Sequence, residues 1–316
     1  MTATIQNEKV IVSISDKGAE LQSVRLKEDN TEYLWQGDST YWGRRAPILF
    51  PIVGRLVDNT YYVDGEPYSL TQHGFARDLT FSVKEQSKTK ITYIVTSNEE
   101  TLKKYPYEFE LLVSYELDGQ IVHVTYEVNN PTSKEMFFSI GAHPGFNFPL
   151  LEGESFTDYH LSFNGSERLE TNVLEGPYLS SKKQLIAENT NELPLTYDLF
   201  KNDALIFENM NTDEISIRSH KHNKFVKVEF DGFPFVGVWT PGENAPFLCI
   251  EPWYGIADEV NPAKDFKEKK EFNLYQRMKH LHVVIVLQSA KLLYPLLKRK
   301  HISRGSSYHL EVSHFD

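Results

Sequence analysis

The chain has 316 residues, 40% of them hydrophobic, and it contains 17 tyrosines and 20 phenylalanines. That is enough apolar material for one large all-β domain, although the length alone also permits two domains. The formal net charge of −11 repels the phosphates of nucleic acid and anionic lipid. We therefore expect neither nucleic acid nor a membrane as a partner.

The single cysteine and the apolar segments bear on location. Cys249 cannot form an internal disulfide, and its apolar neighbours favour a buried structural thiol. Residues 1–10 lack the apolar core of a secretory signal, and residues 281–297 are too short and too polar for a membrane span. Together these features favour a cytoplasmic protein.

Alternation of apolar and polar residues dominates the first third of the chain. Residues 10–14 form an expected strand, and Leu21, Val24 and Leu26 continue extended after a turn at 16–18. Residues 62–66 contain Asp-Gly and are typical of a second turn. Helical patterns are few, and a helix of one or two turns is expected over 99–105.

Two alternating runs, 109–117 and 121–128, are separated by Asp118-Gly119, which predicts a β-hairpin. Further strands are expected over 215–217, 225–230 and 235–239. Short strands at spacings of roughly ten residues are typical of a sandwich or barrel. We predict an all-β fold, a large antiparallel β-sandwich with few short helices, forming a single domain over residues 1–316.

The end of the chain departs from this pattern. Residues 271–302 are expected to be an atypical insertion of uncertain structure, in which a short helix breaks at Pro295. Tyr308, Leu310 and Val312 alternate again and predict a closing strand.

Four short stretches place a chemically able side chain among Gly, Pro and aromatic residues. They are 51–56 with Arg55, 72–77 with His73, 141–146 with His143 and 249–254 with Glu251. Gly and Pro indicate fixed, irregular backbone at strand ends, where sites are often built. Each residue alone has an ordinary structural alternative: an ion pair for the Arg, a packing or surface role for the His residues, a solvated strand end for the Glu.

Taken together, the four residues suit acid–base chemistry on a sugar. Aromatic faces cover the apolar C–H surface of a pyranose, although most of the aromatic residues near these stretches have an equally good role in the core. The candidates are Trp42, Phe75, Phe146, Trp239, Trp253 and Tyr254.

The chain resembles the aldose 1-epimerase (galactose mutarotase) family, and within it the bacterial LacX-like branch, from about residue 10 to 266. Residues 54–65 are similar to the family's N-R-I…L-D-G segment, and His73-Gly74 to its L-H-G motif. His143 with Phe146-Asn147 is similar to H-x-Y-F-N, and Glu251-Pro252 with Asp258 and Asn261 to L-E-x-Q…P-D…N. Each motif is weak alone, but four in order are specific.

The resemblance implies a galactose mutarotase-like supersandwich and a metal-free, cofactor-free isomerase that interconverts the α and β anomers of a hexose. Within the family pattern Glu251 matches the base and His143 the general acid, while Arg55 and His73 match residues near the ring oxygen. Asp203 is the candidate for a further family Asp, with a turn-forming role as the alternative.

Trp239 and Trp253 are the expected aromatic contacts of the sugar. We expect the carboxylate of residue 251 and the imidazole of residue 143 to face opposite sides of one pyranose-sized hollow. At neutral pH a carboxylate and an imidazolium can coexist, because their ordinary pKa values are about 4.3 and 6.5.

Three alternatives stay open. Two His and one Glu could form a facial metal triad, although no His-x-His spacing supports it. A carbohydrate-binding protein without catalysis would use the same aromatic residues. A hexose-6-phosphate 1-epimerase would hold its phosphate with Arg44, Arg45 or Arg77. The sequence leaves open the sugar and the choice between a monomer and a homodimer.

Overall fold

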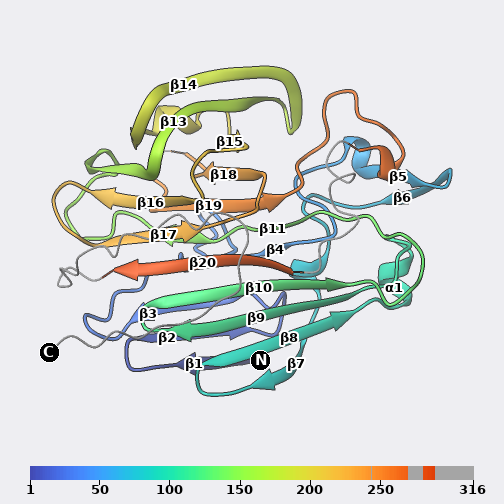
Figure 1. Ribbon diagram of the computed structural model, residues 1–316, viewed down its shortest axis with the longest axis horizontal. Helices are drawn as coiled ribbons and strands as arrows, with labels where there is room; N and C mark the ends of the chain where they lie inside the picture. The colour runs from blue at the N-terminus through green and yellow to red at the C-terminus, as the bar shows by residue number, and fades with distance from the viewer. Residues whose placement is uncertain (243, 270–279, 289–316) are drawn as a thin grey trace, which may run out of the picture.

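The structure is a computed structural model, and it describes residues 1–242, 244–269 and 280–288. Its described strands form three antiparallel sheets (Figure 1). The first sheet contains β1 (Thr2–Gln6), β2 (Val10–Ser15) and β3 (Leu21–Leu26). The smallest is a ribbon of β5 (Thr60–Val63) and β6 (Glu66–Ser69).

The large sheet contains fifteen of the described strands. One half runs in the order β4 (Ile48–Leu49), β11 (Ile140–Ala142), β19 (Phe247–Tyr254), β18 (Phe235–Trp239), β15 (Leu205–Glu208), β13 (Tyr159–Glu175) and β16 (Glu214–Ser219). The other half continues with β17 (Phe225–Glu229), β20 (His280–Gln288), β10 (Ile121–Asn129), β9 (Glu110–Asp118), β8 (Lys90–Thr96) and β7 (Ser82–Gln86). β12 (Gly145–Asn147) pairs with β19, and β14 (Tyr178–Pro194) pairs with β13.

Helices are short and lie in the connections. The α-helix α1 covers Glu99–Leu102, inside the range in which a helix is expected, and Asn98 caps it. Among the described residues, five 3-10 helices lie in loops: Val57–Asn59, Ala76–Asp78, Phe156–Asp158, Tyr197–Phe200 and Phe266–Glu268. Within the described ranges, no helix has the length and apolarity needed to cross a membrane.

Part of the core lies between the three-stranded sheet and strands β8–β10 of the large sheet. Ile5 and Val12 from the first sheet and Val113 and Val122 from the second belong to one fully buried cluster. Tyr115 crosses the interface and donates its hydroxyl proton to the carbonyl of Ala19 at 2.7 Å. The predicted antiparallel β-sandwich is therefore confirmed.

The predicted hairpin at 109–128 and the predicted turn at 62–66 are both present. β9 and β10 pair in register from Asp118 and Ile121 outward, and Gly119 has a φ of +55° in their turn. β5 and β6 are joined by Asp64 and Gly65, both with positive φ, which is the turn that matches the strand twist.

The longest hairpin, β13–β14, has no counterpart among the sequence predictions. Each strand has 17 residues, and the hairpin arches over one end of the large sheet (Figure 1). Most of β14 is exposed, so its sequence is polar and lacks the apolar alternation from which strands are recognised.

The structure describes residues 280–288 of the segment 271–302, for which we expect an atypical insertion. β20 (His280–Gln288) lies inside the large sheet and pairs with β10 on one side and β17 on the other. Its buried positions alternate, as an internal strand requires: Leu281, Val283, Ile285 and Leu287. The helix expected near Pro295 and the strand expected over 308–312 lie outside the described residues.

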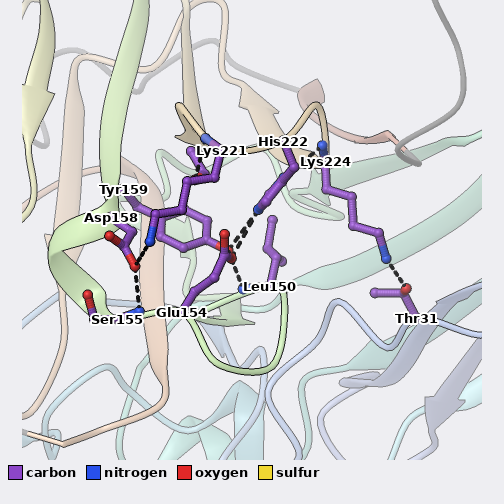
Figure 2. Close-up of polar contacts among 10 residues, drawn as sticks. Thr31, Leu150, Glu154, Ser155, Asp158, Tyr159, Lys221, His222 and Lys224 are labelled. Atoms are coloured by element: carbon purple, nitrogen blue, oxygen red, sulfur yellow. Dashed lines mark hydrogen bonds and ion pairs between the residues drawn. The ribbon is translucent and has the colours of Figure 1, made fainter.

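A buried polar network fixes two loops beside the sheet (Figure 2). Nε2 of His222 lies 3.1 Å from Oε2 of Glu154, and the Tyr159 hydroxyl donates to the same carboxylate. The Tyr159 oxygen also accepts the N–H of Leu150 at 2.8 Å, and Nδ1 of His222 accepts the N–H of Lys224 at 3.0 Å. Both ring nitrogens of His222 therefore have a partner within the protein.

Candidate functional site

Glu251 projects from the centre of β19, whose residues 247–253 are all buried. β18 holds the strand on one side, and β11 and β12 hold it on the other. A strand enclosed in this way leaves its side chains little freedom. Glu251 is only 1% exposed, so its carboxyl group is held in a fixed position.

Trp253, two residues further along β19, fits between two glycines. A Cβ at Gly141 would lie 2.7 Å from its ring, and a Cβ at Gly237 would lie 2.6 Å from the opposite side. Glycine is therefore required at both strand positions to admit the indole, which forms part of the cavity wall next to Glu251.

His143 lies in the connection between β11 and β12. Its ring stacks on Trp42, with 4.8 Å between ring centroids, and meets the edge of Trp239 at 5.8 Å. Its Nε2 lies 3.1 Å from Oε2 of Glu251. The contact is not aligned as a hydrogen bond, because Oε2 of Glu251 has no partner of acceptable geometry among the described residues.

His73 occupies a strained loop position, with a φ of +65°. The next residue must be glycine, because a Cβ at Gly74 would lie 2.3 Å from the carbonyl oxygen of Phe50. Nδ1 of His73 accepts the N–H of Gly54 at 3.1 Å. In the neutral ring the proton is then on Nε2, so this side chain presents a hydrogen-bond donor.

Two arginines share one glutamine at the cavity wall. Arg55 donates from Nη2 to Oε1 of Gln72 at 3.0 Å, and Arg77 donates from Nη2 to the backbone oxygen of Gln72 at 2.6 Å. The Nε atoms of both guanidinium groups are buried without a hydrogen-bond partner in the part of the chain that the structure describes. Buried donors of this kind are normally satisfied, so these two exceptions call for an explanation.

Asp203 and Trp239 lie on the same cavity from two other elements. Asp203 is in the loop before β15, has a φ of +87° and accepts the N–H of its neighbour Ala204 at 2.9 Å. Trp239 is the last residue of β18. Asp203 therefore both forms a turn, the alternative role considered for it, and lines the cavity.

All seven residues predicted for the site line one cavity of about 340 Å³. They are Arg55, His73, His143, Asp203, Trp239, Glu251 and Trp253. The expectation that residues 143 and 251 face each other across the hollow is wrong, since their side chains are in contact on the same wall. The adjacency follows from the register, because β12 pairs directly with β19.

Further residues of the cavity were not predicted as site residues. Trp42 was an aromatic candidate only, Arg77 was considered for phosphate alone, and Gln72 was not singled out although it precedes His73 in the same motif. The other two arginines considered for phosphate are engaged elsewhere. Arg44 pairs with Asp78 at 2.9 Å, and Arg45 donates to the backbone oxygen of Gln22 at 2.7 Å.

Burial shifts the titration of the central pair. Desolvation raises the pKa of Glu251 well above its ordinary value, and the negative charge of Asp203 adds to this. Desolvation lowers the pKa of His143 to about 3, and the positive charges of Arg77 and Arg44 act in the same direction. Both shifts favour the uncharged forms, in contrast to the carboxylate and imidazolium expected from ordinary pKa values.

Burial also lowers the pKa of His73 well below its ordinary value, with His143 and the neighbouring arginines as further causes. The ring is therefore neutral at neutral pH. Together with the Gly54 hydrogen bond, this fixes both its charge and its tautomer.

Three potential metal ligands lie together at the site, but they are not the two histidines and one glutamate considered above. The ligand atoms of His143, Cys249 and Glu251 all lie within 4.8 Å of one another. Cys249 is fully buried, as predicted, and burial raises the pKa of its thiol well above the ordinary value.

The chain was compared with known families and structures. The sequence model of the Aldose 1-epimerase family matches residues 1–272. The chromosomal protein LacX of Lactococcus lactis subsp. lactis is 35% identical over 284 residues, which cover 86% of this chain and 93% of LacX.

Two solved structures are similar over nearly their whole length. A galactose mutarotase related enzyme from Lactobacillus acidophilus is 37% identical with a TM-score of 0.86, covering 92% of this chain and 98% of the other. A galactose mutarotase-like protein from Lactobacillus casei is 35% identical with a TM-score of 0.83, covering 91% and 100%. Four motifs in order, a β-sandwich and these matches agree: the chain belongs to the aldose 1-epimerase family.

Proposed function

We propose that the protein is an aldose 1-epimerase that interconverts the α and β anomers of a free hexose by opening and closing the ring. One observation carries this proposal: the carboxyl group of Glu251 and the imidazole of His143 lie 3.1 Å apart on the wall of a cavity that also presents indole rings. The names of the two bacterial relatives point to galactose as the first sugar to test.

The contact between the two side chains fits the chemistry. The hydroxyl oxygen O1 and the ring oxygen of an aldose are bonded to the same carbon, C1, so their proton acceptor and proton donor must be close together. Glu251 takes the O1 proton while His143 gives a proton to the ring oxygen, and the C1–O5 bond breaks. After rotation about C1–C2 the ring closes on the other face, and both protons return.

The resting pair carries one transferable proton in either of two forms. Burial favours a protonated Glu251 beside a neutral His143. Transfer across the 3.1 Å contact gives the ion pair in which Glu251 is the base. Sugar hydroxyl groups that donate to the buried carboxylate stabilise this ion pair, because hydrogen bonds to the charged form lower a pKa.

The other residues hold the sugar. The Nε2–H of His73 and the guanidinium of Arg55 donate to oxygens near the ring oxygen, and Asp203 accepts from a hydroxyl group at the cavity mouth. Trp239 and Trp253 cover the apolar C–H surface of the pyranose. Removal of a binding group raises KM, whereas removal of a proton-transfer group lowers kcat.

A second candidate substrate is a hexose 6-phosphate, and a specific observation favours it. Arg55 and Arg77 both line the cavity, and the Nε of each has no partner among the described residues; phosphate is an anion that paired guanidinium groups bind well. The single cysteine is consistent with the reducing cytoplasm, where sugar phosphates are found.

The test is the approach to anomeric equilibrium of freshly dissolved α-galactose and α-glucose, followed by polarimetry, and of the 6-phosphates, followed by NMR. We expect the enzyme to accelerate mutarotation of a free hexose. If only the phosphates respond, and Arg77→Ala removes that response, the second candidate replaces the first. A protein that binds the sugars without accelerating their equilibration is a non-catalytic binder, which ends the proposal.

A further inference from the structure

The turn that follows β19 holds the backbone at Arg55 and at Val57, on the two sides of Leu56. The N–H of Asp258 donates to the carbonyl oxygen of Arg55 at 2.9 Å. Oδ2 of Asp258 accepts the N–H of Val57 at 2.9 Å. Asp258, which is only 6% exposed, therefore fixes Arg55 and Val57, the two neighbours of Leu56.

The same turn also fixes the support of His73. Gly54 has a φ of +73°, and a Cβ there would lie 2.5 Å from Cβ of Ala257. This close approach places the Gly54 N–H against Nδ1 of His73, the contact that sets the histidine tautomer. The backbone carbonyl of Gly54 accepts the N–H of His73 at 2.7 Å as well. Ala257 and Asp258 thus support both residues expected near the ring oxygen.

Asp258 is itself held by a buried cation. The ammonium of Lys269 contacts Oδ1 of Asp258, and both side chains are 5% exposed. Burial raises the pKa of Asp258, whereas the charge and hydrogen bond of Lys269 lower it. Because a buried carboxylate is costly without a partner, Lys269 determines whether Asp258 stays in place as a charged acceptor.

We propose that Asp258 and Lys269 form a positioning pair that holds Arg55 and His73 in their substrate-binding geometry. The inference rests on the proposed function, since it assigns those two residues to the sugar. Neither member of the pair lines the cavity, so neither is a catalytic residue. The pair acts through the backbone of Arg55 and Val57 and, through the neighbouring Ala257, on Gly54.

The competing explanation is that the pair only stabilises the fold. A loss of stability lowers the fraction of folded enzyme and hence the apparent kcat, but it leaves the KM of the folded molecules unchanged. Misplacement of Arg55 and His73 raises KM instead. Lys224 offers a matched control, because its side chain is 9% exposed, its ammonium pairs with Asp29 at 2.7 Å, and the residue does not line the cavity.

The experiment compares Lys269→Met, Asp258→Asn, the double variant and Lys224→Met with the wild type for KM, kcat and Tm. We expect each single change at the pair to raise KM roughly tenfold with kcat changed less than about twofold, the pattern for lost substrate binding. The double variant should recover KM to within about threefold, because the Asn oxygen still accepts from Val57 and no unpaired buried charge remains. Lys224→Met should lower Tm alone.

Wild-type KM in both single variants, or an equal rise of KM in Lys224→Met, overturns the proposal. If the single variants fail to fold, the double variant is the test instead. A tenfold rise of its KM also overturns the proposal.

Amide hydrogen exchange tests the positioning without any sugar. In Lys269→Met the N–H groups of Val57 and Gly54 should exchange at least about tenfold faster, because their acceptors move, while Lys224→Met leaves both unchanged. An inactive wild-type protein ends the proposed function alone. Unchanged exchange at Val57 and Gly54 ends the positioning role whatever the activity.

Discussion

Among the described residues, two glutamate–histidine pairs have the same separation. Glu251 and His143 lie 3.1 Å apart at the cavity, and Glu154 and His222 lie 3.1 Å apart in the network of Figure 2. In the network, Tyr159 donates to the carboxylate, and a backbone N–H occupies the second ring nitrogen. At the cavity, Oε2 of Glu251 and Nδ1 of His143 have no hydrogen-bond partner within the described residues.

The difference shows that residue type and distance do not identify a reactive pair. Buried polar atoms are nearly always satisfied, and the exceptions require an explanation. In the network the protein supplies every partner, so the pair is structural. At the cavity these two atoms lack a partner within the described residues, and their side chains line a hollow of about 340 Å³, as expected of a pair that acts on a ligand.

The largest effect is expected for Glu251→Gln. The amide keeps the shape of the side chain but cannot accept the O1 proton, so kcat should fall about 10³-fold with little change in Tm. The matched control is Glu154→Gln, which should leave kcat within about twofold and lower Tm, because it weakens a charge-assisted hydrogen bond. Near wild-type kcat in Glu251→Gln would falsify the assignment of the base.

His143→Asn should have the next largest effect, a decrease of about 10²-fold in kcat and in kcat/KM alike. The proton donor to the ring oxygen is lost, whereas the weak acidity of water provides partial replacement. His222→Asn is the corresponding change in the network. Equal losses of activity in these two variants would remove the distinction between the pairs.

His73→Asn should raise KM roughly tenfold and leave kcat within about threefold, as lost uniform binding requires. Asn is tolerated at positive φ, and its side-chain oxygen can replace Nδ1 as the acceptor for Gly54. The variant therefore removes the Nε2 donor selectively. A decrease in kcat with an unchanged KM would assign His73 to proton transfer instead.

The smallest effect concerns pH. A pair with one proton is inactivated by gaining a second proton or by losing its only one. Because the pKa of His143 is lowered to about 3, kcat/KM should stay constant as the pH falls through 6.5, the ordinary value for histidine. Activity should decline at alkaline pH, as the pH rises through the raised pKa of Glu251.

Asp203→Asn provides the check on that alkaline limb. It removes a negative charge that raises the pKa of Glu251, so the limb should move to lower pH. A pH–rate profile of each variant measures this directly, and an acid limb centred near 6.5 in the wild type would indicate a solvated imidazole at position 143.

The fold was predictable where the signal is local. Alternation and Asp-Gly turns predicted the β9–β10 hairpin, because each buried position repeats every second residue. The same signal was present in β20, but its place between β10 and β17 was not expected. Pairing between strands that are distant in the sequence depends on the whole sheet. The polar strand β14 carried no apolar alternation at all.

The same distinction between local signals and long-range contacts applies to the candidate site. The sequence by itself determined which side chains are chemically able, since the motifs around Arg55, His73, His143 and Glu251 combine them with backbone that Gly and Pro constrain. Only the tertiary structure decided that His143 touches Glu251 on one wall, that Gly54 fixes the His73 tautomer and that both central pKa values move toward neutral forms. These properties arise from burial and from contacts between remote strands, and neither is encoded at any single position of the chain.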